Sequence, residues 1–323
     1  LNKIIKTSPM IVHLIEPLNV EQRIIDSYAE QLTSSGFTFK QWRDRKEDTE
    51  SLIERCKDAD IIIVTNIPIK REVLDECPNL KMISVAFTGV DHIDIKACRK
   101  RNIIVSNAAG YSTQSVAELT LGLMIAALRK MPRNELKIRN GRGREGDTGS
   151  LLFGKTIGIV GAGAIGQAVG RICNIAFNCE VLYFNRTKKR VEHGRLVKLD
   201  ELLSNSDIIS LHVPLNNESN GMIGDEQFAL MKPTAIIINT ARGPVVDTQA
   251  LILALKKNTI AFAALDMYDQ EPPLPEDHPL LSAPSTILMP HIAYATHEAF
   301  KLRAQIVFEN ILKWQQGALQ NVQ

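Results

Sequence analysis

The stretch "TIGIVGAGAIGQAVGRICNIAF" (156–177) joins an apolar run, three closely spaced glycines and an Ala- and Ile-rich segment. It predicts a buried strand, a tight turn and a helix, and another apolar run follows at 181–184. Glycine triplets also occur by chance in structural turns. Between a strand and a helix, however, the spacing of Gly161, Gly163 and Gly166 is typical of a dinucleotide-binding turn.

Each glycine of this turn has a separate physical task. Gly161 permits the tight turn, Gly163 lets the backbone approach a pyrophosphate, and Gly166 allows the helix to pack closely on the strand. The N–H groups of Ala164 and Ile165 are expected to face the phosphates from the positive end of the helix dipole. The stretch therefore predicts a site for a dinucleotide cofactor.

Apolar runs alternate with amphipathic segments along most of the chain, which is typical of parallel strands covered by helices on both faces. The sequence predicts an α/β protein with two doubly wound parallel-sheet domains. One is a Rossmann dinucleotide-binding domain at 104–295. The other is a flavodoxin-like substrate domain at 1–103, completed by a C-terminal helical segment, 296–323. A long apolar helix is expected at 116–131.

Composition narrows the classes of function. The 323 residues carry a formal net charge of +2, which argues against a field that recruits nucleic acid or an anionic membrane. The five cysteines are odd in number and form no CxxC pair, which argues against a disulfide framework and a zinc site. The longest apolar run, 119–128, is about half the length needed to cross a bilayer. We expect a cytoplasmic protein without a metal site.

The segment "LYFNRTKK" (182–189) bears on the choice of cofactor. A carboxylate at the end of this strand would bind both ribose hydroxyls and repel a 2′-phosphate. Asn185 removes that repulsion, and Arg186 offers positive charge to the phosphate. The alternative is a solvated basic turn in which Asn185 still binds the ribose. We favour NADP(H), and NAD(H) remains possible.

Residues capable of chemistry follow three further apolar runs. Arg242 follows 234–240, Asp266 ends the next run with Glu271 close behind, and His291 follows the last run. An open parallel sheet binds its ligands at the carboxyl ends of its strands. Taken singly, each residue has another explanation: a surface arginine, a loop acid, or a buried or capped histidine.

Ordered motifs over nearly the whole chain resemble those of the D-isomer-specific 2-hydroxyacid dehydrogenases, and of glyoxylate and hydroxypyruvate reductases among them. The motifs are "FTGVDHID" (87–94), "NAAGYSTQSVAELT" (107–120), the glycine turn, "HVPLNNES" (212–219), "NTARGPVVD" (239–247), "PEDHPLL" (275–281) and "MPHIA" (289–293).

The resemblance implies a catalytic set of Arg242, Glu271 and His291. Arg242 would bind the carboxylate and ketone of a 2-oxo acid, and His291 would protonate the nascent alkoxide as hydride arrives from the nicotinamide. Glu271 would orient the imidazole and favour its protonated form. The other side of the substrate carboxylate would meet the backbone N–H groups of Thr88, Gly89 and Val90.

The resemblance also implies cofactor contacts at strand ends. Asp266 would contact the nicotinamide carboxamide, beside Thr240, Ala241 and His291. The adenosine and pyrophosphate side would be lined by His212, Val213, Pro214 and Ser219. We expect His212 to act as a wall of that pocket rather than as an acid or base.

Our leading hypothesis is a reductase of small 2-oxo acids to D-hydroxy acids. One alternative is an NAD-dependent D-3-phosphoglycerate or D-lactate dehydrogenase. An alternative of another class is a dinucleotide-sensing, corepressor-like binding module, which can keep the Arg–Glu–His set. We also expect a homodimer through the apolar helix 116–131, the alternative being a helix fully buried within one subunit.

Overall fold

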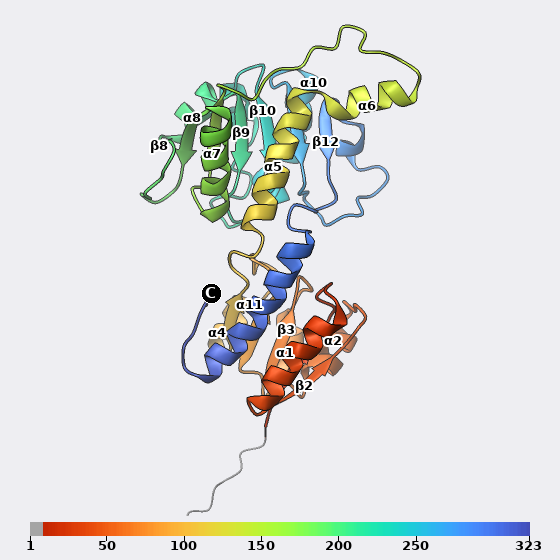
Figure 1. Cartoon of the computed structure of the whole chain (residues 1–323), viewed down its shortest axis with the longest axis vertical. Coiled ribbons are helices and arrows are strands. Elements are labelled where there is room, and N and C mark those ends of the chain that lie inside the picture. The colour runs from red at the N-terminus through yellow and green to blue at the C-terminus, as the bar shows by residue number, and fades with distance from the viewer. Residues whose placement is uncertain (1–8) are drawn as a thin grey trace, which may run out of the picture. The chain divides into compact units, whose positions relative to one another are not determined.

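The computed structural model describes residues 9–323, and its contacts divide the chain into two units (Figure 1). The first unit comprises the described residues up to Ser112 together with Ala295–Gln323. The second unit is Thr113–Tyr294. Within the described residues, each unit is built on one sheet in which all neighbouring strands are parallel.

The sheet of the first unit has the order β2-β1-β3-β4-β5 in the described part of the chain, which is the flavodoxin-like order. Helices α1 and α11 pack against each other, α1 on β2 and α11 on β4 and β5. The strands are β1 (Met10–Leu14), β2 (Phe37–Gln41), β3 (Ile61–Val64), β4 (Met82–Val85) and β5 (Ile104–Asn107), and the helices are α1 (Gln22–Ser34), α2 (Thr49–Cys56), α3 (Arg71–Asp75), α4 (Ile95–Lys100) and α11 (His297–Gln315).

Helix α11 is fixed to this sheet by buried side chains. The Ser84 hydroxyl donates to the carbonyl of Val307 at 2.9 Å, and the Asn310 amide donates to the carbonyl of Asn107 at 3.0 Å. The C-terminal helix therefore packs as part of the first unit.

The boundary between the units differs from the predicted one. We expected the second domain to begin at residue 104, but β5 hydrogen-bonds to β4 and so belongs to the first sheet. The second unit begins at Thr113. A short apolar strand has the same sequence pattern in either domain, so the pattern alone does not assign β5.

The sheet of the second unit has the order β12-β11-β10-β9-β6-β7-β8 among the described residues. The strands are β6 (Thr156–Val160), β7 (Glu180–Phe184), β8 (Arg195–Leu196), β9 (Ile208–Leu211), β10 (Ile236–Asn239), β11 (Phe262–Leu265) and β12 (Thr286–Leu288). The helices are α5 (Thr113–Leu128), α6 (Met131–Arg139), α7 (Ala164–Phe177), α8 (Leu199–Asn205), α9 (Asp225–Leu230) and α10 (Thr248–Lys256), with 3-10 turns at Gly243–Val245 and Pro279–Ser282.

This second sheet is buried on both faces. Successive residues of a strand point to opposite faces, so Ile237 packs into one core cluster while Ile236 and Ile238 pack into the other. Helices α5 and α7 pack on each other over one face and stand in front of the sheet in Figure 1. Strand β10 therefore reads as a continuous apolar run from Ile236 to Ile238.

The apolar helix expected at 116–131 is found as α5, which begins three residues earlier, at Thr113, and ends three residues earlier, at Leu128. Helix α5 ends at Leu128, Lys130 adopts a left-handed conformation with a φ of 51°, and α6 begins at Met131. Since α5 also contacts α7, β10 and β11, much of its apolar surface is covered within its own unit.

Candidate active site

The carboxyl ends of the parallel strands in the second unit meet at one edge of the sheet. The strand order passes from β6 to β7 on one side and to β9 on the other, which is the switch point where open α/β sheets bind ligands. The predicted residues that follow these strands are Gly161–Gly166 after β6, Asn185 and Arg186 after β7, His212–Ser219 after β9, Thr240–Arg242 after β10, Asp266 and Glu271 after β11, and His291 after β12.

The glycine turn has the geometry that a pyrophosphate needs. Gly161 has a φ of +106°, and a Cβ there would lie 2.5 Å from the carbonyl oxygen of His212. A Cβ at Gly166 would lie 2.1 Å from the carbonyl oxygen of Gly161. A Cβ at Gly163 would meet nothing within 4 Å, so the turn is open there, at the N-terminus of α7. The residues present thus fit a dinucleotide.

A cavity of about 360 Å³ lies beside this turn. Five predicted residues line it, whereas the predicted His212 does not. Its lining is Phe184, Asn185, Arg186, Thr187, Val213, Pro214, Asn216, Glu218, Ser219 and Met222. Sequence reasoning missed the other five of these, although four of them, Phe184, Thr187, Asn216 and Glu218, stand within quoted motifs.

Asn185 ties two loops together. Its side-chain oxygen accepts from the N–H of Ala162 in the glycine turn at 3.1 Å, and its amide donates to the carbonyl of Thr187 at 2.9 Å. A carboxylate could accept the first bond but could not donate the second. An asparagine here therefore has a structural explanation besides cofactor choice.

Arg186 and Glu218 form an ion pair at the rim of the same cavity. Their side chains are 69% and 64% exposed. An ion pair this exposed contributes about 0–1 kcal/mol to stability, so either partner can exchange it for another at low cost.

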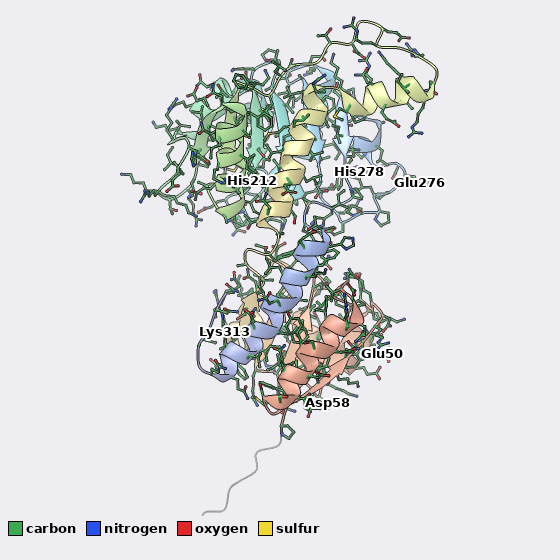
Figure 2. All side chains as sticks on the ribbon, viewed as in Figure 1. Glu50, Asp58, His212, Glu276, His278 and Lys313 are labelled. Atoms are coloured by element: carbon green, nitrogen blue, oxygen red, sulfur yellow. The ribbon has the colours of Figure 1, made fainter. Side chains whose placement is uncertain are left out.

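The two histidines marked in Figure 2 do not line the described cavity. His212 Nε2 lies 2.9 Å from the Ser210 hydroxyl, and burial lowers the pKa of His212 to about 3. His278 Nε2 lies 3.1 Å from a carboxylate oxygen of Asp269. His212 is therefore neutral at pH 7, and His278 holds its own loop.

His291 and Glu271 meet directly. Nδ1 of His291 lies 2.9 Å from a carboxylate oxygen of Glu271. The His291 side chain is 11% exposed, and its ring meets the Tyr294 ring edge-on at 5.1 Å between centroids. Its backbone φ of 56° is left-handed, a conformation that costs a histidine of order 1 kcal/mol and recurs at functional sites.

Asp266 holds the turn that carries His291. Its two carboxylate oxygens accept from the N–H groups of Ile292 and Ala293, both at 2.8 Å, and the side chain is fully buried. Burial raises the pKa of Asp266, while the two donors lower it. The Tyr268 hydroxyl donates to the carbonyl of Met289 at 2.8 Å. Sequence reasoning missed both of these positioning contacts.

Arg242 stands on a turn held by Asn239. The buried Asn239 amide donates to the carbonyl of Arg242 at 2.9 Å, and its oxygen accepts from the N–H of Ala241 at 3.0 Å. The hydroxyl of Thr240 lies 3.1 Å from that of Thr120 on α5. Hence the three residues after β10 are fixed by buried polar contacts that sequence reasoning did not predict.

Thr88, Gly89 and Val90 follow β4 in the first unit. The Asn107 amide donates to the carbonyl of Thr88 at 2.6 Å and fixes the start of this loop. This loop belongs to the first unit, whereas Arg242, Glu271 and His291 belong to the second unit.

Two absences hold for residues 9–323. No group of three or more His, Cys, Asp or Glu side chains is arranged to hold a metal ion. In the same part of the chain, no helix has both the length and the apolar character that crossing a membrane requires.

Comparison with known proteins decides the family. The family model for the D-isomer specific 2-hydroxyacid dehydrogenase, NAD binding domain, matches residues 121–293, more than half of the chain. The chain belongs to this family. The matched region contains the glycine turn, Arg242, Glu271 and His291, so the Rossmann unit is the family's NAD-binding domain.

Individual family relatives agree over most of the chain. The glyoxylate reductase of Thermofilum pendens is 41% identical over 290 residues, which cover 87% of this chain and 84% of that protein. The D-3-phosphoglycerate dehydrogenase of Methanocaldococcus jannaschii is 39% identical over 94% of this chain, but only 57% of that protein is covered.

Among solved structures, an acyclic imino acid reductase in complex with NADPH and D-Arg superposes with a TM-score of 0.89. It is 32% identical and covers 97% of this chain and 99% of that one. With the family match, this likeness makes the chain a nicotinamide-dependent oxidoreductase of the 2-hydroxyacid dehydrogenase type.

Proposed function

We propose that this protein reduces small 2-oxo acids, such as glyoxylate and hydroxypyruvate, to D-2-hydroxy acids and uses NADPH in preference to NADH. The observation that carries the proposal is the 2.9 Å contact between His291 Nδ1 and Glu271, at the same sheet edge as the glycine turn and Arg242. The similarity to glyoxylate reductases supports the substrate class.

His291 is the proton donor in this proposal. Because Nδ1 is bonded to Glu271, the imidazole presents Nε2 to the substrate oxygen. A bound reduced nicotinamide supplies the hydride. In reduction, His291 gives its proton to the nascent alkoxide, and in the reverse direction it accepts a proton from the hydroxyl.

Arg242 binds the substrate in this proposal. A guanidinium offers paired N–H donors that match a carboxylate and an adjacent carbonyl oxygen. Its charge stabilises the oxygen as negative charge develops on it. The parallel role of the backbone N–H groups at Thr88, Gly89 and Val90 rests on the family resemblance alone.

Three further residues complete the proposed nicotinamide side. Thr240 and Ala241 would line it, and Asp266 would accept a hydrogen bond from the carboxamide. Each Asp266 oxygen has a second lone pair besides the one used for Ile292 or Ala293, so this role is compatible with the observed contacts.

The preference for NADPH rests on charge near the ribose. Asn185 is uncharged, and Arg186 lines the adenosine-side cavity with Lys188 and Lys189 close behind in the sequence. A 2′-phosphate would find cationic partners there. The NADPH complex of a 32% identical protein supports this choice.

D-3-phosphoglycerate dehydrogenase activity is the second candidate, because one relative with that name is 39% identical. The deciding experiment measures the absorbance of the reduced cofactor with NADPH and NADH against glyoxylate, hydroxypyruvate, pyruvate and phosphohydroxypyruvate. We expect the largest kcat/KM for NADPH with glyoxylate or hydroxypyruvate. A clear preference for NADH would contradict the cofactor proposal, and a preference for phosphohydroxypyruvate would favour the second candidate.

We also propose a homodimer. The segment 131–153 exposes the large apolar side chains of Met131, Leu136, Ile138, Leu151 and Phe153. Association of two copies would remove such surface from water. Light scattering is expected to give twice the chain mass, and a monomer at working concentration would contradict this.

All five cysteines are free and buried, which supports a reducing, cytoplasmic location.

A further inference from the structure

One contact at the adenosine-side cavity is not explained by cofactor binding. Among the described residues that line the cavity, Arg186 and Glu218 carry the only charges, one of each sign. They are paired with each other across 32 positions of the sequence. The cation expected to attract a 2′-phosphate is therefore already bound to a carboxylate.

The backbone holds Glu218 at this place. The side-chain oxygen of Asn216 accepts from the N–H groups of Glu218 at 2.9 Å and Ser219 at 3.1 Å. The Ser219 hydroxyl donates to the carbonyl of Pro214 at 2.6 Å. Because these bonds hold the backbone at Glu218 and Ser219, the Glu218 side chain starts from a fixed point at the cavity rim.

The negative charge of the Glu218 carboxylate affects which cofactor binds. A 2′-phosphate is close to dianionic at pH 7, so it and Glu218 attract the same guanidinium and repel each other. A dinucleotide without that phosphate leaves the Arg186–Glu218 pair intact. The Glu218 carboxylate therefore opposes the binding of NADPH and does not oppose the binding of NADH.

We infer that Glu218 is a specificity-determining residue that competes with the 2′-phosphate of NADPH for Arg186 and so narrows the preference for NADPH over NADH. The inference rests on the proposed function, because it requires that the cavity bind the adenosine half of a nicotinamide dinucleotide. Glu218, on the loop after β9, would thus determine cofactor choice together with the residues that follow β7.

The test uses two probes that differ only in that phosphate, 2′,5′-ADP and 5′-AMP. Their dissociation constants are measured by calorimetry at low ionic strength, where exposed charges are least screened. The Glu218→Gln variant is expected to bind 2′,5′-ADP about three- to fivefold more tightly than wild type, and 5′-AMP within about twofold.

The matched control is Glu201→Gln. Glu201 pairs with Arg195 at 2.7 Å on the same unit, is similarly exposed, and does not line the cavity. We expect this variant to bind both probes as wild type does. Equal tightening in the two variants, or no tightening in Glu218→Gln, would overturn the inference.

A second pair of variants, made in a chain without Arg186, separates competition for that guanidinium from direct repulsion between Glu218 and the phosphate. In the Arg186→Gln chain, adding Glu218→Gln is expected to change 2′,5′-ADP affinity by less than about twofold, because there is no guanidinium left to compete for. Persistence of the full effect would refute the competition.

Failure of this inference can be told from failure of the proposed function. The probes need no turnover, so a chain that prefers NADH or a different keto acid can still show the Glu218→Gln shift. If neither probe binds the wild-type chain at all, the proposed cofactor site itself is wrong.

Discussion

The two ends of the second sheet's carboxyl edge are built differently. At the β10–β12 end, the side chains that hold the loops are buried and bonded to backbone, as with Asn239 and Asp266. At the β7–β9 end, Arg186 and Glu218 are mostly exposed and bonded to each other. The first end fixes geometry through the fold, and the second leaves its charges free to exchange partners.

This difference matches what each end is proposed to do. Proton and hydride transfer depend on placement within a fraction of an ångström, so the groups that support His291 and Arg242 must be rigid. Discrimination between two cofactors depends on a single phosphate group, and exposed charges suffice for it. Variants at the two ends should therefore affect different quantities.

The largest effect is expected for His291→Ala. Loss of the general acid should lower kcat about a thousandfold. The dissociation constant of NADPH should stay within about twofold, because the ring is proposed to act on the substrate. Stopped-flow turnover and fluorescence titration measure the two quantities, with the exposed His193→Ala as control. A comparable loss of kcat and of NADPH affinity would mean that the β10–β12 end and the β7–β9 end do not act independently.

A smaller loss is expected for Asp266→Asn. An amide offers a single acceptor oxygen, so one of the buried N–H groups of Ile292 and Ala293 loses its partner and the His291 turn relaxes. We expect kcat to fall about a hundredfold, and kcat/KM for the keto acid with it. Asp269→Asn, at a half-exposed carboxylate, is the control. Wild-type turnover in Asp266→Asn would show that the buried scaffold is dispensable.

The neutral His212, whose ring lies beside the Ser210 hydroxyl, predicts that stability falls at acid pH. Its folded pKa of about 3 lies below the unfolded value, so the unfolded chain binds the extra proton as pH falls. Its contribution to stability is full above pH 6.5 and is lost progressively toward pH 3, by about 2 kcal/mol at pH 5.

Urea unfolding of wild type and His212→Asn at pH 7 and pH 5 measures this contribution. The variant should lose about 2 kcal/mol less than wild type between the two values. Identical losses would show that His212 is not held neutral by the fold.

The smallest effect is expected at the exposed end, for Asn185→Asp. The new carboxylate would repel a 2′-phosphate and cannot donate to the carbonyl of Thr187. We expect kcat/KM to fall about tenfold with NADPH and less than threefold with NADH. Equal losses with both cofactors would assign Asn185 a purely structural role.

The sequence predicts the framework of both ends well. Apolar runs followed by helices predict parallel strands, and parallel strands bring Gly161, Arg242 and His291 to one edge. Helix 296–317 is found as α11, because its amphipathic period is long. These predictions rest on local patterns repeated over many residues.

Other features depend on contacts that no local pattern encodes. The Arg186–Glu218 pair joins residues 32 positions apart, and Asp266 reaches backbone groups 26 and 27 positions away. Such contacts are set by the packing of neighbouring strands and emerge only with the fold. The break at Lys130 is an exception, because Pro132 stands in the first turn of α6 and is a local sequence signal of a helix start.

Isotope transfer measures directly whether a hydride passes to a 2-oxo acid at the β10–β12 end. The protein is incubated with hydroxypyruvate and NADPH carrying deuterium at both positions of nicotinamide carbon 4, and the glycerate is analysed by chiral chromatography and mass spectrometry. We expect D-glycerate with one deuterium on carbon 2. L-Glycerate, or product without deuterium on that carbon, would contradict the proposed function.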